Sequence, residues 1–239
     1  MENSNYNRSY YSEGYGTSGS MVMQNTMIRN VYLWMTGALI VTALVAYYVA
    51  TSPNLLSLIY GNSLVFWGLI IAEFGLVIGI NAAINKISAT TATIMFLLYS
   101  VVNGATLASI FAVYSMSAIG TTFLVTSGTF GAMALYGSVT KTDLTKWGNI
   151  LLMGVIGLVI AGVVNIFLQN SMMDMIISGI GVLIFVGLTA YDSQKIKQML
   201  YGAEDNEMTQ KIAVIGALSL YLDFVNLFLY LLRFFGRRN

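Results

Sequence analysis

The chain has 239 residues, of which 57% are hydrophobic and only 9% are charged, and its formal net charge is +1. A soluble domain carries about 25% charged residues, so this composition indicates one polytopic membrane domain and gives no sign of nucleic-acid binding. The chain contains no Cys and no His, which excludes disulfides, structural zinc, a Cys or Ser–His nucleophile and a histidine pH switch. Proton or metal chemistry would therefore depend on Asp, Glu, Tyr or Lys, and we expect no enzymatic activity.

Residues 1–27 differ in composition from the rest of the chain. They are rich in Asn, Ser, Gly and Tyr and show no apolar periodicity, which predicts a disordered tail. The stretch lacks the basic start and short apolar core of a signal peptide, so we expect the first hydrophobic segment to remain as a membrane anchor. The predicted domains are a cytoplasmic tail over residues 1–27 and a seven-helix transmembrane domain over residues 28–239.

Seven segments are apolar over about 20 residues, the length that crosses a bilayer as a helix. Their approximate ranges are 31–50, 64–83, 91–114, 120–139, 149–168, 172–196 and 211–235. Strand-like alternation is absent, so the predicted fold class is an all-α integral membrane protein with seven transmembrane helices. Glycines at GxxxG spacing in the second segment, Gly75 and Gly79, and further glycines in the fifth and sixth predict close helix packing.

Basic residues fall on alternate sides of the membrane through the first six segments. They are Arg8 and Arg29 before the first segment, Lys86 after the second, Lys141 and Lys146 after the fourth, and Lys195 and Lys197 at the end of the sixth. The positive-inside rule then predicts a cytoplasmic N-terminus. Arg233, Arg237 and Arg238 break this pattern if the seventh segment crosses, so it either spans or is re-entrant; its length of about 25 residues favours spanning.

Three acidic residues lie in the hydrophobic segments, where carboxylates are costly and mark function. Glu73 lies in the middle of the second segment, and Asp192 lies near the cytoplasmic end of the sixth. Asp223 is about 12 residues into the seventh segment, with Asn226 one helical turn further on the same face. A hydrogen-bonded structural role remains an alternative for each acid taken alone.

Asp192 and Asp223 lie on consecutive antiparallel helices, which allows them to form a pair. Two carboxylates in contact cannot both ionise cheaply, so they would share a proton and attract a divalent cation when both are deprotonated. Calcium takes oxygen ligands and fits a site that lacks His and Cys. Counted from Lys197 and Lys211, however, the two acids differ in depth by roughly 10 Å. They meet only if the sixth helix enters deeper or the seventh begins above the membrane plane.

The stretches around both aspartates resemble signatures of a known family. ALSLYLDFVNLFLYLLRFFG, which contains Asp223, and TAYDSQKI, which contains Asp192, are similar to the Bax inhibitor-1 (transmembrane Bax inhibitor motif) family, and the resemblance covers roughly residues 25–236. It implies a bacterial member with seven helices and a central last helix. It also implies a di-aspartyl pH sensor at Asp192 and Asp223 and a calcium-leak path that includes a family acid matched by Glu73.

One family feature departs from the pattern in this chain. In bacterial relatives an arginine near the end of the second helix is thought to latch onto the first aspartate. The matching region here reads NAAINKIS, which leaves Lys86 as the nearby cation. A lysine is a point charge without the bidentate fork of arginine, so the resemblance implies a looser latch or none.

The leading hypothesis is a pH-sensitive calcium-leak channel of a bacterial inner membrane, with calcium as the transported or bound ion and no other cofactor. Asp192 and Asp223 would form the gate and the calcium ligands, Glu73 and Asn226 the ion path, and Lys86 a possible latch. The alternative is a non-catalytic regulator in the bilayer that binds a membrane protein partner, such as a membrane-anchored ATP-dependent protease, through its tail.

An intramembrane aspartyl protease is a third hypothesis, since such enzymes also use two membrane aspartates. Tyr191-Asp192 matches the Tyr-Asp pair that carries their first aspartate. Their second aspartate follows Gly-x-Gly and precedes a Pro-Ala-Leu motif, whereas Tyr221-Leu222 precedes Asp223 and the only proline is Pro53. The sequence therefore disfavours this class.

Overall fold

The computed structural model describes the backbone of residues 4–236 and the side chains from Val22 onward. Within these residues the chain forms nine helices and no strand. The helices are α1 (Ser4–Ala50), α2 (Pro53–Tyr60), α3 (Ser63–Ala83), α4 (Ala89–Leu107), α5 (Ile110–Val113), α6 (Met116–Val139), α7 (Thr145–Leu168), α8 (Ser171–Met199) and α9 (Glu207–Phe235). Seven helical segments are long and apolar enough to cross a membrane, which confirms the predicted fold class.

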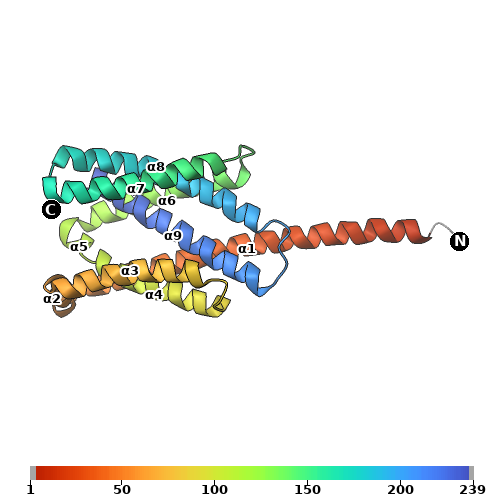
Figure 1. The fold of residues 1–239 in the computed structure, drawn as a ribbon, viewed down its shortest axis with the longest axis horizontal. Coiled ribbons are helices and arrows are strands. Elements are labelled where there is room, and N and C mark those ends of the chain that lie inside the picture. Colours follow the sequence, from red (N-terminus) through yellow and green to blue (C-terminus); the bar gives the residue numbers. More distant parts are fainter. Residues whose placement is uncertain (1–3, 237–239) are drawn as a thin grey trace.

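The last helix, α9, is the centre of the bundle. Figure 1 shows α9 running diagonally between α7 and α8 on one side and α3 and α4 on the other. It packs against α8, α1, α6 and α4. In its most apolar stretch 61% of the residues are buried, against 6% in α3 and in α7. The central position implied for the last helix is thus confirmed, and α3 and α7 present most of their surface to lipid.

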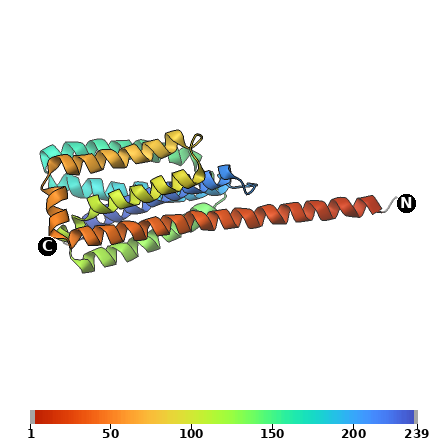
Figure 2. The same cartoon turned by 90° about the horizontal axis from the view of Figure 1, so that it is seen from below.

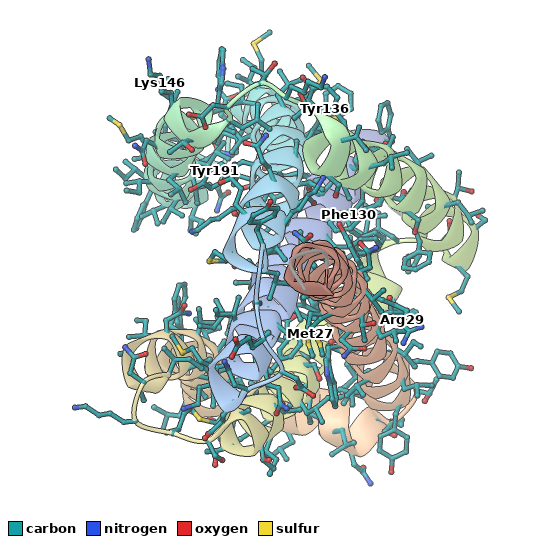
Figure 3. All side chains as sticks on the ribbon, turned by 90° about the vertical axis from the view of Figure 1, so that its right-hand side faces the viewer. Met27, Arg29, Phe130, Tyr136, Lys146 and Tyr191 are labelled. Atoms are coloured by element: carbon teal, nitrogen blue, oxygen red, sulfur yellow. The ribbon has the colours of Figure 1, made fainter. Side chains whose placement is uncertain are left out.

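The first helix extends beyond the bundle on its N-terminal side, as Figures 1 and 2 show. Its packed part begins near Met23, and Figure 3 shows Met27 turned towards the bundle and Arg29 away from it. The backbone is helical without a break from Ser4, while residues 1–3 lie outside the described residues. The division into a tail and a transmembrane domain at residue 27 stays a prediction.

The third predicted segment is interrupted, and the short helix α2, which was not predicted, forms hydrogen bonds to the backbone at the break. Residues 91–114 divide into α4 and α5, which are separated at Ala108 and Ser109. The Tyr60 hydroxyl at the end of α2 donates to the Thr106 carbonyl (2.8 Å) and accepts from the Ser109 N–H (2.9 Å). A broken helix at membrane depth needs such partners for its freed backbone groups, which explains why α2 folds back at this position.

Glycine packing differs from the prediction for the second segment. A Cβ built at Gly75 on α3 would meet nothing within 4 Å, so that GxxxG glycine does not pack against a helix. A Cβ at Gly104 would lie 2.7 Å from the Thr42 carbonyl, and one at Gly137 would overlap the Ala190 carbonyl. These two glycines allow α4 to approach α1 and α6 to approach α8.

The path of α9 bears on whether the last segment spans. The helix is continuous over 29 residues, about 43 Å at 1.5 Å per residue, and ends near the turn that joins α7 to α8 (Figure 1). At this end Arg233 Nη1 lies 3.4 Å from Asp174 Oδ1 of α8. The ion pair gives the positive charge a partner at the end of the bundle where the topology rule does not expect one. Length and position both support the spanning interpretation.

Candidate functional site

Asp223 is buried in the middle of α9. Its side chain is 4% exposed, and its Oδ2 atom has no hydrogen-bond partner among the described residues. The helix that carries it starts at an N-cap, where the Asn206 side chain accepts from the Thr209 N–H (2.9 Å). The Glu207 side chain also accepts from the Ala89 N–H at the start of α4 (3.3 Å). These contacts fix where α9 begins and therefore how deep Asp223 lies.

The register of α8 against α9 brings Asp192 and Asp223 together. Gly216 packs against Ile196, and Gly181 packs against Tyr230, so the two helices run antiparallel past these contacts. Followed from either contact, Asp223 lies at the level of Leu188 or Thr189, about one helical turn from Asp192. The two carboxyl groups interact electrostatically. The depth difference expected from the sequence is thus reduced to about 5 Å, because α9 begins beyond the level at which α8 ends.

Asp192 is half-buried near the end of α8, and a neighbouring amide holds this end in place. The buried Gln194 side chain donates to the Thr142 carbonyl (2.8 Å) and accepts from the Leu144 N–H (2.9 Å). Both partners lie in the loop between α6 and α7. These two hydrogen bonds, made two residues beyond Asp192, hold α8 against the loop between α6 and α7.

Hydroxyl groups lie around the level of the pair. Thr189 and Ser193 donate to carbonyls one turn earlier in α8, at 2.8 Å and 2.7 Å. Tyr32 of α1 donates to the Ser193 hydroxyl oxygen (3.4 Å). Both α8 side chains are buried, so their remaining lone pairs lie inside the bundle.

The cation expected as a latch does not reach the pair. Lys86 is exposed in the turn between α3 and α4 and takes part in neither of the two ion pairs formed by the described residues. The cation that acts electrostatically on Asp192 is Lys195, three residues along the same helix. Lys195 is exposed and lies over the Tyr191 ring, 5.7 Å from its centroid. In this structure Asp192 therefore has no latch from another helix within the described part of the chain.

Glu73 lies on the other side of α9, in a separate site. The Thr106 hydroxyl donates to Glu73 Oε1, and Asn103 Nδ2 donates to Glu73 Oε2 at 3.4 Å. Glu73 lines a cavity of about 690 Å³ between α3, α4, α7, α8 and α9. Asn226 lines the same cavity and donates to the Leu222 carbonyl of its own helix (2.8 Å). Asp223 is not among the lining residues, so the cavity with Glu73 and Asn226 ends short of the aspartate pair.

A buried hydrogen-bond network joins Glu73 to α9, and the sequence alone did not single it out. Asn103 accepts from the Tyr221 hydroxyl (2.9 Å), which is 2.7 Å from the Thr42 hydroxyl of α1. Thr42 in turn donates to the Ser100 carbonyl of α4 (2.9 Å). A tyrosine two residues before a buried aspartate was the available signal for this network.

The described residues contain no group of three or more Asp, Glu, His or Cys side chains that converge as a metal site. Asp192 and Asp223 supply two carboxylates at most. Calcium takes six to eight oxygen ligands, so an ion at this pair would also need hydroxyl, carbonyl or water oxygens. Calcium coordination at the pair stays a prediction.

Comparisons with known proteins identify the family. The family model described as "Inhibitor of apoptosis-promoting Bax1" matches residues 24–239. The chain belongs to the Bax inhibitor-1 family. The inner membrane protein YbhL of Escherichia coli K12 is 49% identical over 216 residues, which cover 90% of this chain and 92% of YbhL.

Two further bacterial proteins are similar to this chain over most of their length. An uncharacterised protein of Borreliella burgdorferi is 46% identical over 220 residues, which cover 92% of this chain and 95% of that protein. An uncharacterised protein of Deinococcus radiodurans is 37% identical over 214 residues, covering 90% and 91% of the two chains. The family resemblance seen around the two aspartates is therefore confirmed over nearly the whole transmembrane domain.

Proposed function

We propose that this Bax inhibitor-1 family protein is a non-enzymatic, pH-sensitive calcium-leak channel gated by Asp192 and Asp223. The observation that carries the proposal is the proximity of two carboxyl groups inside the bundle, Asp192 of α8 and Asp223 of the central helix α9. An uncompensated buried carboxylate is costly, so a second one beside it needs either a shared proton or a cation. Glu73, in a cavity on the other side of α9, supplies a further acid on the proposed ion path.

The gate works through repulsion between the two acids. When the pair holds a proton, at most one of the two carboxyl groups is charged, repulsion is absent, and α8 stays against α9. When both are deprotonated, like charges repel, and the repulsion favours separation of the helices or entry of a cation. In the closed state the packing around Asp223 excludes cations from the pair. Once the helices separate, a cation arriving through the Glu73 cavity would reach the pair.

The proposed location is a bacterial inner membrane with a cytoplasmic N-terminus. The name of the similar E. coli protein supports the membrane. The alternation of basic residues along the chain supports the orientation. Fusing a reporter that is active only in the periplasm to the C-terminus tests the orientation, and an inactive fusion would contradict it.

Calcium flux in reconstituted liposomes tests the channel directly. With a calcium dye inside the vesicles, we expect the flux measured between about pH 5 and pH 8 to depend on pH, because protonation changes the charge of the pair. Asp223→Asn and Asp192→Asn should remove the pH dependence. Asp143→Asn is the matched control, since Asp143 is exposed in the loop between α6 and α7. Wild-type vesicles that pass no calcium at any of these pH values would refute the channel.

A second function, regulation of a membrane protein partner, is favoured by one observation. The N-terminal part of α1 projects from the bundle and offers a helix for contact outside the channel (Figure 2). A partner such as a membrane-anchored ATP-dependent protease would bind there. Deleting residues 1–21 should abolish co-purification of the partner and leave calcium flux intact; unchanged co-purification would exclude this role for the segment.

A further inference from the structure

The cavity that contains Glu73 also contains one fixed cation. Among the residues that line it, the charged ones are Glu73 of α3 and Arg233 of α9. Arg233 lies seven residues beyond Asn226, which places it on the same face of α9 and about 10 Å nearer the end of the helix. The Arg233 side chain lines the cavity and is 42% exposed, so the edge of the cavity beside it, near the end of α9, is open.

Two contacts hold the Arg233 guanidinium at this opening. One nitrogen lies 3.4 Å from Asp174 of α8, whose side chain is 29% exposed. The guanidinium carbon lies 5.9 Å from the centre of the Tyr230 ring, which also lines the cavity. Tyr230 packs in turn against Gly181 and stacks on Phe185, both of α8. Residues of both α8 and α9 therefore hold the Arg233 guanidinium in place.

We propose that Arg233 sets the charge preference of the cavity, and that Asp174 moderates it by pairing. The proposal rests on the proposed function only in assuming that the ions which matter are cations moving towards Glu73. An unpaired guanidinium at the opening would repel cations, and calcium twice as strongly as a monovalent ion. Pairing with Asp174 lowers the net charge at the opening, so the ion pair determines how readily a cation enters.

A single introduced cysteine measures this potential without any assay of transport. The chain has no Cys, so Asn226→Cys places one thiol in the cavity. Its reaction rates with a cationic and an anionic thiosulfonate reagent of similar size report the local charge. A unit charge 10 Å away changes each rate about twofold in water and more at lower dielectric, so Arg233→Gln should raise the cation-to-anion rate ratio at least about fourfold.

Three further variants make the result specific. Arg233→Lys keeps the charge and should keep the ratio, while Asp174→Asn should lower it about twofold by leaving Arg233 without this partner. Lys211→Gln is the matched control, since Lys211 forms an ion pair of similar length (3.3 Å) with Glu207 and does not line the cavity. An equal shift in the control, no shift in Arg233→Gln, or a thiol that reacts with neither reagent would each overturn the proposal.

Calcium flux in the same variants links the potential to transport. Arg233→Gln should increase calcium leak about fourfold, because the divalent ion feels twice the potential of a monovalent one. If wild type passes no calcium but the thiol ratio shifts, the channel is refuted and the charge preference stands. If calcium passes and the ratio does not shift, the charge preference is refuted and the channel stands.

Discussion

Replacing Tyr221 with Phe tests the network that joins α9 to α1 and α4. Tyr221 is 0% exposed, and its hydroxyl lies 2.7 Å from the Thr42 hydroxyl and 2.9 Å from Asn103 Oδ1. Its ring packs edge-on against Phe96 and Tyr99, and Phe preserves both of these contacts. The substitution therefore removes one oxygen and its hydrogen bonds while leaving the packing in place.

The expected cost follows from the groups that lose a partner. Thr42 retains its bond to the Ser100 carbonyl, whereas Asn103 Oδ1 loses the donor from Tyr221. A buried acceptor left unsatisfied costs about 1–3 kcal/mol, but hydrogen bonds between membrane helices average about 0.6 kcal/mol with a maximum near 1.7. We therefore expect Tyr221→Phe to lower the free energy of unfolding by about 1–2 kcal/mol.

Reversible unfolding in mixed detergent and SDS micelles, followed by circular dichroism, measures this change. Tyr99→Phe is the matched control, because it removes the same atom from an adjacent ring whose hydroxyl has no hydrogen bond within the described residues. A double-mutant cycle of Tyr221→Phe with Thr42→Val should give a coupling energy of at least about 0.5 kcal/mol. If Tyr221→Phe and Tyr99→Phe agree within about 0.3 kcal/mol, the network contributes nothing and the reasoning fails.

Three other changes have defined outcomes. Gly137→Ala should lower the free energy of unfolding by about 1–3 kcal/mol, because the new Cβ would overlap the Ala190 carbonyl. Gly157→Ala is the control, since a Cβ there would meet nothing within 4 Å. Equal effects of the two substitutions in the same micelle assay would contradict this. Tyr60→Phe should speed hydrogen exchange at residues 105–110, where its hydroxyl bonds the backbone, and unchanged exchange would exclude that role. Hydrogen bonds from Thr145 lower the pKa of Asp143 in the folded protein. The ionised Asp143 carboxylate therefore stabilises the fold at pH values above its unfolded pKa, and this stabilisation is lost as pH falls through its folded pKa. Below about pH 4 the melting temperature of Asp143→Asn should depend less on pH than that of the wild type.

Hydropathy was sufficient to predict the membrane-crossing helices, because a bilayer demands about 20 apolar residues from each. It could not predict which face of each helix is buried. In α3 and α7 the lipid-facing and bundle-facing sides are both apolar, so periodicity carries no signal. For this reason the predicted packing at Gly75 was wrong, and the close approach at Gly137 was not foreseen.

The acidic residues could be found from the sequence because charge in a hydrophobic segment is conspicuous. Their hydrogen-bond partners could not be found in this way. Glu73 bonds to Thr106 and Asn103, and nothing in the spacing of α3 and α4 reveals that these residues face each other. The expected depth difference between Asp192 and Asp223 came from assuming that Lys197 and Lys211 lie at one level. The contact between Ile196 and Gly216 shows instead that Lys211 lies about one helical turn beyond the level of Lys197.

The two acidic sites lie on different sides of α9, yet they are joined through it. Tyr221 and Asp223 are two residues apart, so their side chains leave the helix about 160° apart, on nearly opposite sides. The Tyr221 side is bonded to Thr42 and Asn103, and Asn103 also donates to Glu73. A movement of α9 that separates Asp223 from Asp192 must therefore also displace the Tyr221 hydroxyl from its partners. If the proposed gate opens by such a movement, the network would resist it and would link it to the cavity, although the cavity itself does not reach the pair.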